Sequence, residues 1–225
     1  MRGLTLGRAV PYHALMDSAR IVSVNLGVPR EVEWEGRRFT TAIVKTPAAG
    51  PVALRGVNFV GDDQADRSVH GGRDKAVYAY SAEDYAWWDG ELGTPLAPGT
   101  FGENLTVAGL DASAAVVGER WRIGDALLEV AGPRVPCYKL GWRMHDVHFV
   151  KRFAHALRPG AYLRIVEPGT VAQGDRIEVL DRPAHGVTVR DVARIFFFEP
   201  GRVPELLTVP ELGASWHEWA ARKHV

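Results

Sequence analysis

The chain has a single cysteine, no excess of charge of either sign and no long apolar run, and each absence narrows its possible functions. Cys137 has no cysteine partner within the chain, so an internal disulfide is excluded and no oxidising compartment is indicated. Lys and Arg together number 27, as do Asp and Glu, so the chain lacks the basic character of a general nucleic-acid or anionic-membrane binder. No stretch approaches the roughly 18 apolar residues of a membrane span, and residues 1–20 lack the apolar core of a signal peptide. We therefore expect a soluble cytoplasmic protein that binds neither nucleic acid nor membrane.

Glycine and proline are abundant, at 24 and 14 residues, and they divide the chain into short segments. Many of these segments alternate or are rich in β-branched residues, which predicts eight to ten short strands. Glu35-Gly36 predicts the turn of a hairpin, and Ser81 is expected to cap a helix that begins at residue 82. A second helix is expected in "FVKRFAHAL". The pattern favours a mainly β fold, a barrel or closed sandwich with a few peripheral helices.

The character of the sequence changes after Arg182-Pro183. Thr188 with Asp191 three residues later resembles a capping box, and the residues that follow predict three short helices. A unit of about forty residues hardly folds alone, so we expect it to pack on the barrel. The predicted division is a barrel domain over 1–182 and a helical extension over 186–225. The aromatic residues of the extension, Trp216, Trp219 and Phe196–Phe198, are expected mainly in its core.

Three polar, glycine-containing segments could carry chemistry. "HGGRDK" (70–75) has paired glycines, at which the backbone can approach a ligand, and cations able to hold an anion. "FGENLT" (101–106) and "GDDQAD" (61–66) are weaker signals. Taken alone, the first two are more typical of polar turns than of a site, and the third is best interpreted as a solvated acidic loop.

The lone thiol lies in "PRVPCYKLGW" (133–142). Two prolines stiffen the segment, and Arg134 and Lys139 would favour the thiolate form of Cys137. A buried structural thiol remains equally possible on these residues alone. CxxC, HExxH, Walker A and dinucleotide motifs are all absent. A Cys-His-Asp nucleophile arrangement stays open.

Taken together, "GDDQAD", "VHGGRDKAVYAY", "FGENL" and "PRVPCYKL", in this order, resemble the MOSC family, named for the C-terminal domain of molybdenum cofactor sulfurases. The resemblance covers about residues 20–182. It is strongest to the stand-alone YiiM-type branch, which carries a three-helix C-terminal extension and is linked to resistance to 6-hydroxylaminopurine. It implies a MOSC-type β-barrel that holds the molybdenum cofactor, a molybdopterin whose dithiolene sulfurs bind the metal.

The resemblance also implies roles for individual residues. Cys137 corresponds to the additional metal ligand, and a soft thiolate suits a metal already bound by sulfur. The candidates for holding the cofactor's phosphate are Arg134, Lys75, Arg73 and the amides of Gly71 and Gly72. The candidates for contacting the pterin or the oxygens on the metal are His70, Asp74 and Asn104, with His70 also a proton source. The large pyridoxal-phosphate domain of the sulfurases has no counterpart here, so no pyridoxal phosphate is expected.

The function implied is a molybdenum-dependent oxidoreductase that reduces N-hydroxylated compounds such as hydroxylamino-purines, amidoximes and hydroxylamines. Electrons would come from a separate flavin or iron–sulfur reductase. One alternative is a module that carries the cofactor, or sulfur, without turnover. Another is a metal-free hydrolase or transferase that uses Cys137 with His70 and Asp74.

Overall fold

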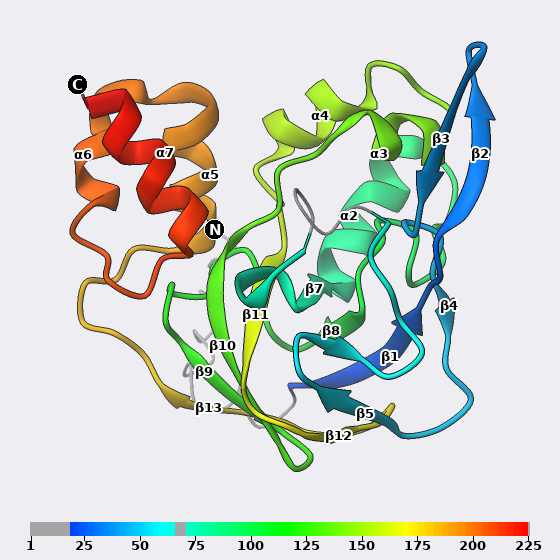
Figure 1. Ribbon diagram of the computed structural model, residues 1–225, viewed down its shortest axis with the longest axis horizontal. Helices are drawn as coiled ribbons and strands as arrows, with labels where there is room; N and C mark the ends of the chain where they lie inside the picture. Colours follow the sequence, from blue (N-terminus) through cyan, green and yellow to red (C-terminus); the bar gives the residue numbers. More distant parts are fainter. Residues whose placement is uncertain (1–18, 66–70, 225) are drawn as a thin grey trace, which may run out of the picture.

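An eight-stranded sheet forms the centre of the computed structural model, which describes residues 19–65 and 71–224 (Figure 1). The strands lie in the order β13 (Ile177–Asp181), β9 (Arg120–Ile123), β10 (Ala126–Pro133), β11 (Ala161–Glu167), β7 (Val77–Ser81), β8 (Leu105–Ala108), β1 (Arg20–Leu26) and β4 (Thr46–Pro47). The pair β7 and β8 is parallel, because helix α2 (Ala82–Leu92) connects the two strands; the other pairs in the sheet are antiparallel. The mainly β fold is as expected.

The sheet curls toward a barrel without a continuous ladder between its two ends. The start of β1 meets the segment that leads into β13 at one bridge, between Arg20 and Arg176. The amide of Ile21 donates to the carbonyl of Asp175 at 2.8 Å, and that of Ile177 donates to the carbonyl of Ala19 at 2.9 Å. These hydrogen bonds satisfy part of both edges, so the expected barrel is present in an incompletely closed form.

Two smaller sheets flank the large one. One consists of β12 (Gly169–Val171), β5 (Val52–Arg55) and β6 (Asn58–Phe59). The other is the hairpin of β2 (Arg30–Trp34) and β3 (Arg37–Thr41), which extends away from the sheet in Figure 1. Glu35 and Gly36 at its tip have φ values of 49° and 74°, the positive values that a two-residue turn with the twist of a hairpin requires. The turn predicted at these residues is confirmed.

Strand β7 is buried along its whole length because it is covered on both faces. Val77 and Ala79 face the apolar interior of the curled sheet. Tyr78 and Tyr80 face an aromatic cluster under α2, α3 (Tyr138–Arg143) and α4 (Phe149–Ala156). The indole of Trp88 in this cluster donates to the hydroxyl of Tyr80 at 2.8 Å. The cluster fixes the outer face of β7, on which part of the candidate site is built.

Ser81 does not cap α2 as predicted, although the helix begins at Ala82 as expected. Its hydroxyl instead donates to the carbonyl of Leu110 at 2.9 Å and accepts from the amide of Ala112 at 2.8 Å. Ser81 is only 1% exposed. Water cannot reach this position, so the backbone groups of Leu110 and Ala112 need hydrogen-bond partners from the protein.

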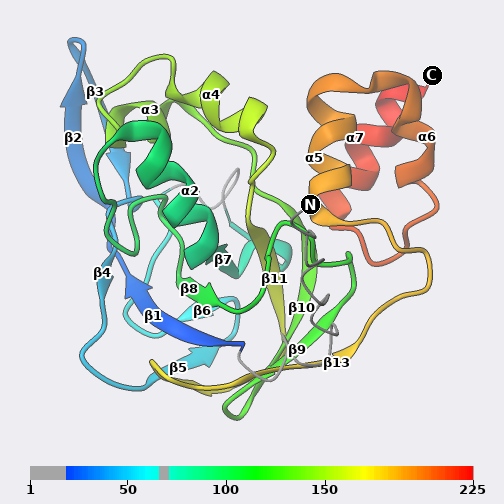
Figure 2. The ribbon, with the colours of Figure 1, turned by 180° about the vertical axis from the view of Figure 1, so that it is seen from behind.

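Three helices follow the last strand and lie to one side of the sheet (Figures 1 and 2). They are α5 (Val189–Phe198), α6 (Val203–Leu206), which follows the short helix η2 (Pro200–Arg202), and α7 (Ala214–His224). The predicted capping box is confirmed, since Thr188 and Asp191 each bond the other's backbone amide at 3.1 Å. The division of the chain at 182 and 186 stays a prediction. None of the helices in 19–65 and 71–224 is long and apolar enough to cross a membrane.

The three helices share a small apolar core with the sheet. Val117, from the segment before β9, is buried among the helical side chains. Trp216 of α7 lies against Gly132 of β10, where an added Cβ would come within 3.0 Å of the indole nitrogen. The amide of Gly213 donates to the carbonyl of Ala131 at 2.9 Å. These contacts attach the helices to β10, the strand that leads to Cys137.

Candidate functional site

Cys137 lies at a junction between a strand and a helix. Strand β10 ends at Pro133, and α3 begins directly after Cys137. The cysteine has extended backbone angles (φ −128°, ψ 173°), and its carbonyl accepts the amide of Leu140 at 2.9 Å. Its side chain is half-buried. The rigid segment was predicted, whereas α3, only six residues long and containing Gly141, was not.

Two cavities adjoin at this cysteine. The inner cavity has a volume of about 100 Å³ and extends under β7 and the loop before β8. The outer cavity has a volume of about 500 Å³ and lies between the end of β10, α3 and the C-terminal helices. The residues that line both are Lys75, Cys137, Lys139 and Tyr162. Cys137 therefore lies on the boundary between two adjoining cavities.

The inner cavity is locally cationic in a chain whose charges balance overall. The cations that line it are Lys45, Lys75, Arg134 and Lys139, against the two carboxylates of Asp62 and Asp63. Such an excess of positive charge favours an anionic ligand.

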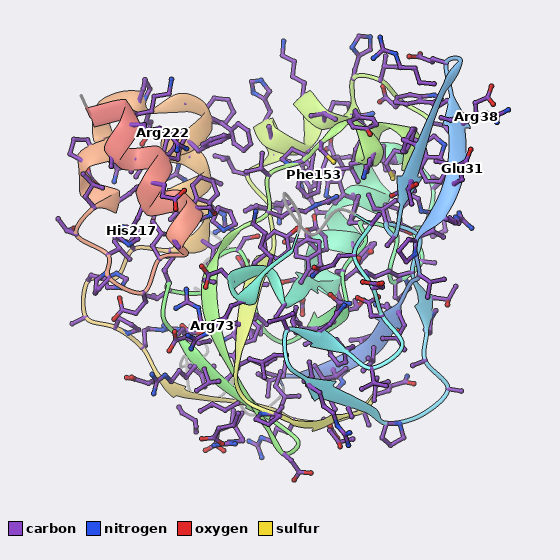
Figure 3. All side chains as sticks on the ribbon, in the orientation of Figure 1. Glu31, Arg38, Arg73, Phe153, His217 and Arg222 are labelled. Carbon is purple, nitrogen blue, oxygen red and sulfur yellow. The ribbon has the colours of Figure 1, made fainter. Side chains whose placement is uncertain are left out.

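Arg134 is the most deeply buried of these cations, with 6% of its surface exposed. Its guanidinium lies 5.3 Å from the ring centre of Tyr78 and 5.6 Å from that of Phe153, which Figure 3 labels. Burial alone lowers the pKa of Arg134, but the charges that Tyr78, Tyr162 and Cys137 can carry raise it overall, so the guanidinium stays charged. The atom Nη1 is buried and has no hydrogen-bond partner in the described part of the chain. A buried cationic donor without a partner is costly unless a ligand supplies the acceptor.

Lys45 and Asp62 form a buried ion pair in the wall of the inner cavity. Their side chains are 7% and 3% exposed, and Nζ lies 2.5 Å from Oδ1. Burial lowers the pKa of Lys45, and the charges of Asp62 and Glu103 offset part of this effect. The interpretation of "GDDQAD" as a solvated acidic loop is thus wrong for Asp62. Sequence reasoning missed Lys45, because nothing near an isolated lysine in the sequence indicates an aspartate 17 positions away.

Asn104 lines the inner cavity, but its side-chain amide is already used within the fold. Its Oδ1 accepts the amide of Tyr78 at 3.1 Å. Its Nδ2 donates to Asp62 at 2.9 Å and to the carbonyl of Asn25 at 3.3 Å. Asn104 therefore positions Asp62 and the start of β7. Its predicted contact with the pterin stays a prediction.

The segment 70–75 contributes one described residue, Lys75, to the cavities. Burial lowers the pKa of Lys75, and Asp74 partly offsets the shift. Gly71, Gly72 and Arg73 line neither cavity. Gly72 has a φ of 94°, and nothing lies within 4 Å of the position that a Cβ would take. Arg73 is exposed in the short helix η1 (Arg73–Lys75). His70 lies outside the described residues.

Asp74 connects the sheet to the C-terminal helices. One carboxylate oxygen lies 3.0 Å from Nε of Arg164 on β11, and the other accepts the amide of Ala214 at the start of α7 at 2.8 Å. Both oxygens are thus engaged outside the two cavities. This placement gives no support to a Cys137-His70-Asp74 triad.

No group of three His, Cys, Asp or Glu side chains lies close enough to hold a metal ion within 19–65 and 71–224. Cys137, whose soft sulfur is of the kind that binds metals, lines both cavities in the described part of the chain.

Comparison with known proteins gives a consistent result. The family model of the MOSC domain matches residues 66–178. The chain is 38% identical over 199 residues to "Uncharacterized protein YflK" of Bacillus subtilis, covering 87% of this chain and 90% of that protein. It is 33% identical over 183 residues to "Protein YiiM" of Escherichia coli, covering 78% and 81%. A "Reductase" of Gibberella moniliformis is 34% identical over 166 residues, which are 71% of this chain but 29% of that protein.

A solved structure supports the same relationship. The crystal structure of YiiM from Geobacillus stearothermophilus matches with a TM-score of 0.76 at 30% identity, covering 92% of this chain and 100% of that one. This match covers most of the chain, whereas the family model matches residues 66–178 alone. The chain belongs to the MOSC domain family.

Proposed function

We propose that this protein binds the molybdenum cofactor with Cys137 as a ligand of the metal and reduces N-hydroxylated compounds. The observation that carries the proposal is the position of Cys137 between a cationic inner cavity and a larger outer cavity. The MOSC family is associated with the molybdenum cofactor, and one relative is named a reductase.

The residues present fit the phosphate and the metal of such a cofactor. Its phosphate needs charged donors, and Arg134 offers a buried Nη1 without a partner in the described residues. Lys75 and Lys139 add positive charge where the cavities adjoin. The thiolate of Cys137 is the soft ligand that a sulfur-bound metal prefers, and the nearby cation of Arg134 favours this thiolate.

When bound, the cofactor supplies the electron pair that cleaves the N–O bond. The substrate R–NHOH takes up this pair and two protons, and it leaves as R–NH₂ and water. The chain's own residues hold the cofactor and deliver protons. Lys75 lines both cavities, and because burial lowers its pKa, its ammonium group is a stronger acid than an exposed lysine. His70 remains a second candidate for this role.

In this proposal, electrons reach the site from a separate flavin or iron–sulfur reductase. The direct assay uses protein co-expressed with cofactor biosynthesis, reduced methyl viologen as artificial donor and 6-hydroxylaminopurine as substrate. We expect metal-dependent formation of the amine. A protein that contains molybdenum, reduces no N-hydroxylated compound and activates a cofactor-free molybdoenzyme would instead be a carrier.

A further inference from the structure

The outer cavity has aromatic and apolar walls from two distant parts of the chain. On one side, Val135 and Tyr138 flank Cys137 and are 37% and 53% exposed. On the other side are Phe196 of α5 with Trp216 and Trp219 of α7. These three aromatic residues lie beyond residues 66–178, the part that the family model matches.

The three rings form one connected cluster. Phe196 lies 4.9 Å from Trp219 and 5.2 Å from Trp216, measured between ring centres, and the two tryptophans are 5.9 Å apart. Trp216 is 8% exposed and packs on Gly132, so its position is fixed. Phe196 and Trp219 are only half-buried and line the cavity. Packed aromatic rings with few rotatable bonds provide a rigid surface for binding at a small entropic cost.

Most polar side chains of the outer cavity lie at one end. Lys75, Cys137 and Lys139 lie where it adjoins the inner cavity, and the wall of the helices adds one polar residue, Ser215 of α7. A ligand that matches this distribution has a flat apolar body and a polar group at one edge. The volume of about 500 Å³ is within the usual range for small-molecule sites.

We propose that the outer cavity binds the planar aromatic ring of the substrate and that Phe196 and Trp219 determine this preference. The inference rests on the proposed function in one respect, because it assigns the polar edge of the ligand to the N–O group that faces Cys137. The C-terminal helices then form part of the substrate site, in addition to covering the sheet. Aromatic N-hydroxylated compounds are bound more tightly than aliphatic ones with the same reactive group.

The test compares benzamidoxime with acetamidoxime, which share the amidoxime group and differ in the ring. Binding is measured by calorimetry on full-length, cofactor-loaded protein without an electron donor, so that no turnover occurs. We expect benzamidoxime to bind about tenfold more tightly, because the ring buries apolar area that a methyl group lacks. Trp219→Leu, which keeps an apolar side chain, should weaken benzamidoxime about fivefold and leave acetamidoxime unchanged.

Trp87→Leu is the matched control. Trp87 is also half-buried, but it packs on Trp88 and Arg158 and lines neither cavity. Equal binding of the two amidoximes, or equal effects of the two substitutions, would overturn the proposal. Binding of the ring only to cofactor-free protein would also overturn it, because the cofactor itself would then fill the outer cavity.

The same data separate this inference from the proposed function. Ring-selective binding that depends on Trp219, without reduction when the donor is added, supports the aromatic site and refutes the reductase. Reduction of both amidoximes with equal affinity supports the reductase and refutes the aromatic site. Phe196→Leu serves as the second variant if Trp219→Leu does not fold.

Discussion

In the proposed function, the chemistry of the site depends on two residues three positions apart, Arg134 and Cys137. Their proximity was predictable, since both lie in a short segment stiffened by prolines, and the structure places both in the inner cavity. The positions of Asp74 and Asn104 were not predictable. Polar residues in glycine-rich loops can hold either a ligand or the fold, and the backbone partner of Asp74 on α7 is 140 positions away.

Arg134→Met tests whether the guanidinium, whose Nη1 has no partner in the described residues, holds the cofactor. The methionine keeps much of the apolar contact with Tyr78 and Phe153 but removes the charge. We expect molybdenum per chain after dialysis to fall about tenfold or more, since a charged hydrogen bond contributes about 1.5–3 kcal/mol.

Arg158→Met is the control for this substitution. Arg158 also stacks on an aromatic ring, that of Trp87, and pairs with buried Asp84, but it lines neither cavity. The substitution Arg158→Met should lower the stability of the fold and leave the metal content unchanged. Retention of molybdenum at the wild-type level in Arg134→Met would exclude the assigned role.

Glu103 should make stability depend on pH. Its Oε1 accepts three hydrogen bonds, from Gly99, Tyr85 and Thr106. Its Oε2 is buried without a partner in the described residues. Burial raises the pKa of Glu103, although these hydrogen bonds oppose the shift. In the pH range between its unfolded and folded pKa values, the folded state therefore holds the proton more often than the unfolded state.

It follows that stability falls as the pH rises through this range, by at most about 1.4 kcal/mol per pH unit. Glu103→Gln removes the titrating group and hence this fall. Urea unfolding measures the free energy of unfolding of the wild-type protein and of Glu103→Gln from about pH 5 upward. The difference between the two proteins should first grow with pH and then become constant. A difference independent of pH would show that the pKa of Glu103 is the same in both states.

At the scale of elements, most strands and the longer helices could be predicted because they follow local periodicity and local caps. The capping box of α5 and the β2–β3 turn need only neighbouring residues. Helix α3 was missed because six residues give too short a period to recognise. The role of Ser81 was missed because its partners, Leu110 and Ala112, are about thirty positions away.

Asp74→Ala tests the link between the sheet and α7. It removes the acceptor for the amide of Ala214 and one partner of Arg164, which retains Glu129 at 3.0 Å. We expect a loss of about 1–2 kcal/mol in unfolding free energy and faster hydrogen exchange at the start of α7. Glu31→Ala, in the exposed pair with Arg38 on the hairpin, should change stability by less than about 0.5 kcal/mol.

If Asp74 instead held the cofactor, Asp74→Ala would lower the molybdenum content without altering hydrogen exchange in α7. This result would contradict the structural role given to Asp74.

At the scale of the whole molecule, the site exists only where distant parts of the chain meet. The inner cavity combines residues from position 41 to position 162, and the outer cavity adds residues up to position 219. The sequence predicted the mainly β fold and the packing of a helical unit on it. It did not predict a cavity between the two. The tail aromatics were expected mainly in the core, which holds for Trp216, whereas Phe196 and Trp219 stay half-buried at the cavity.

X-ray absorption at the molybdenum edge shows directly whether Cys137 is a ligand of molybdenum. The measurement compares wild-type protein with Cys137→Ser, both purified after co-expression with cofactor biosynthesis. We expect molybdenum in the variant to have one sulfur neighbour fewer, with oxygen in its place, because serine offers a harder ligand. The same number of sulfur neighbours and the same metal content in both proteins would contradict this expectation.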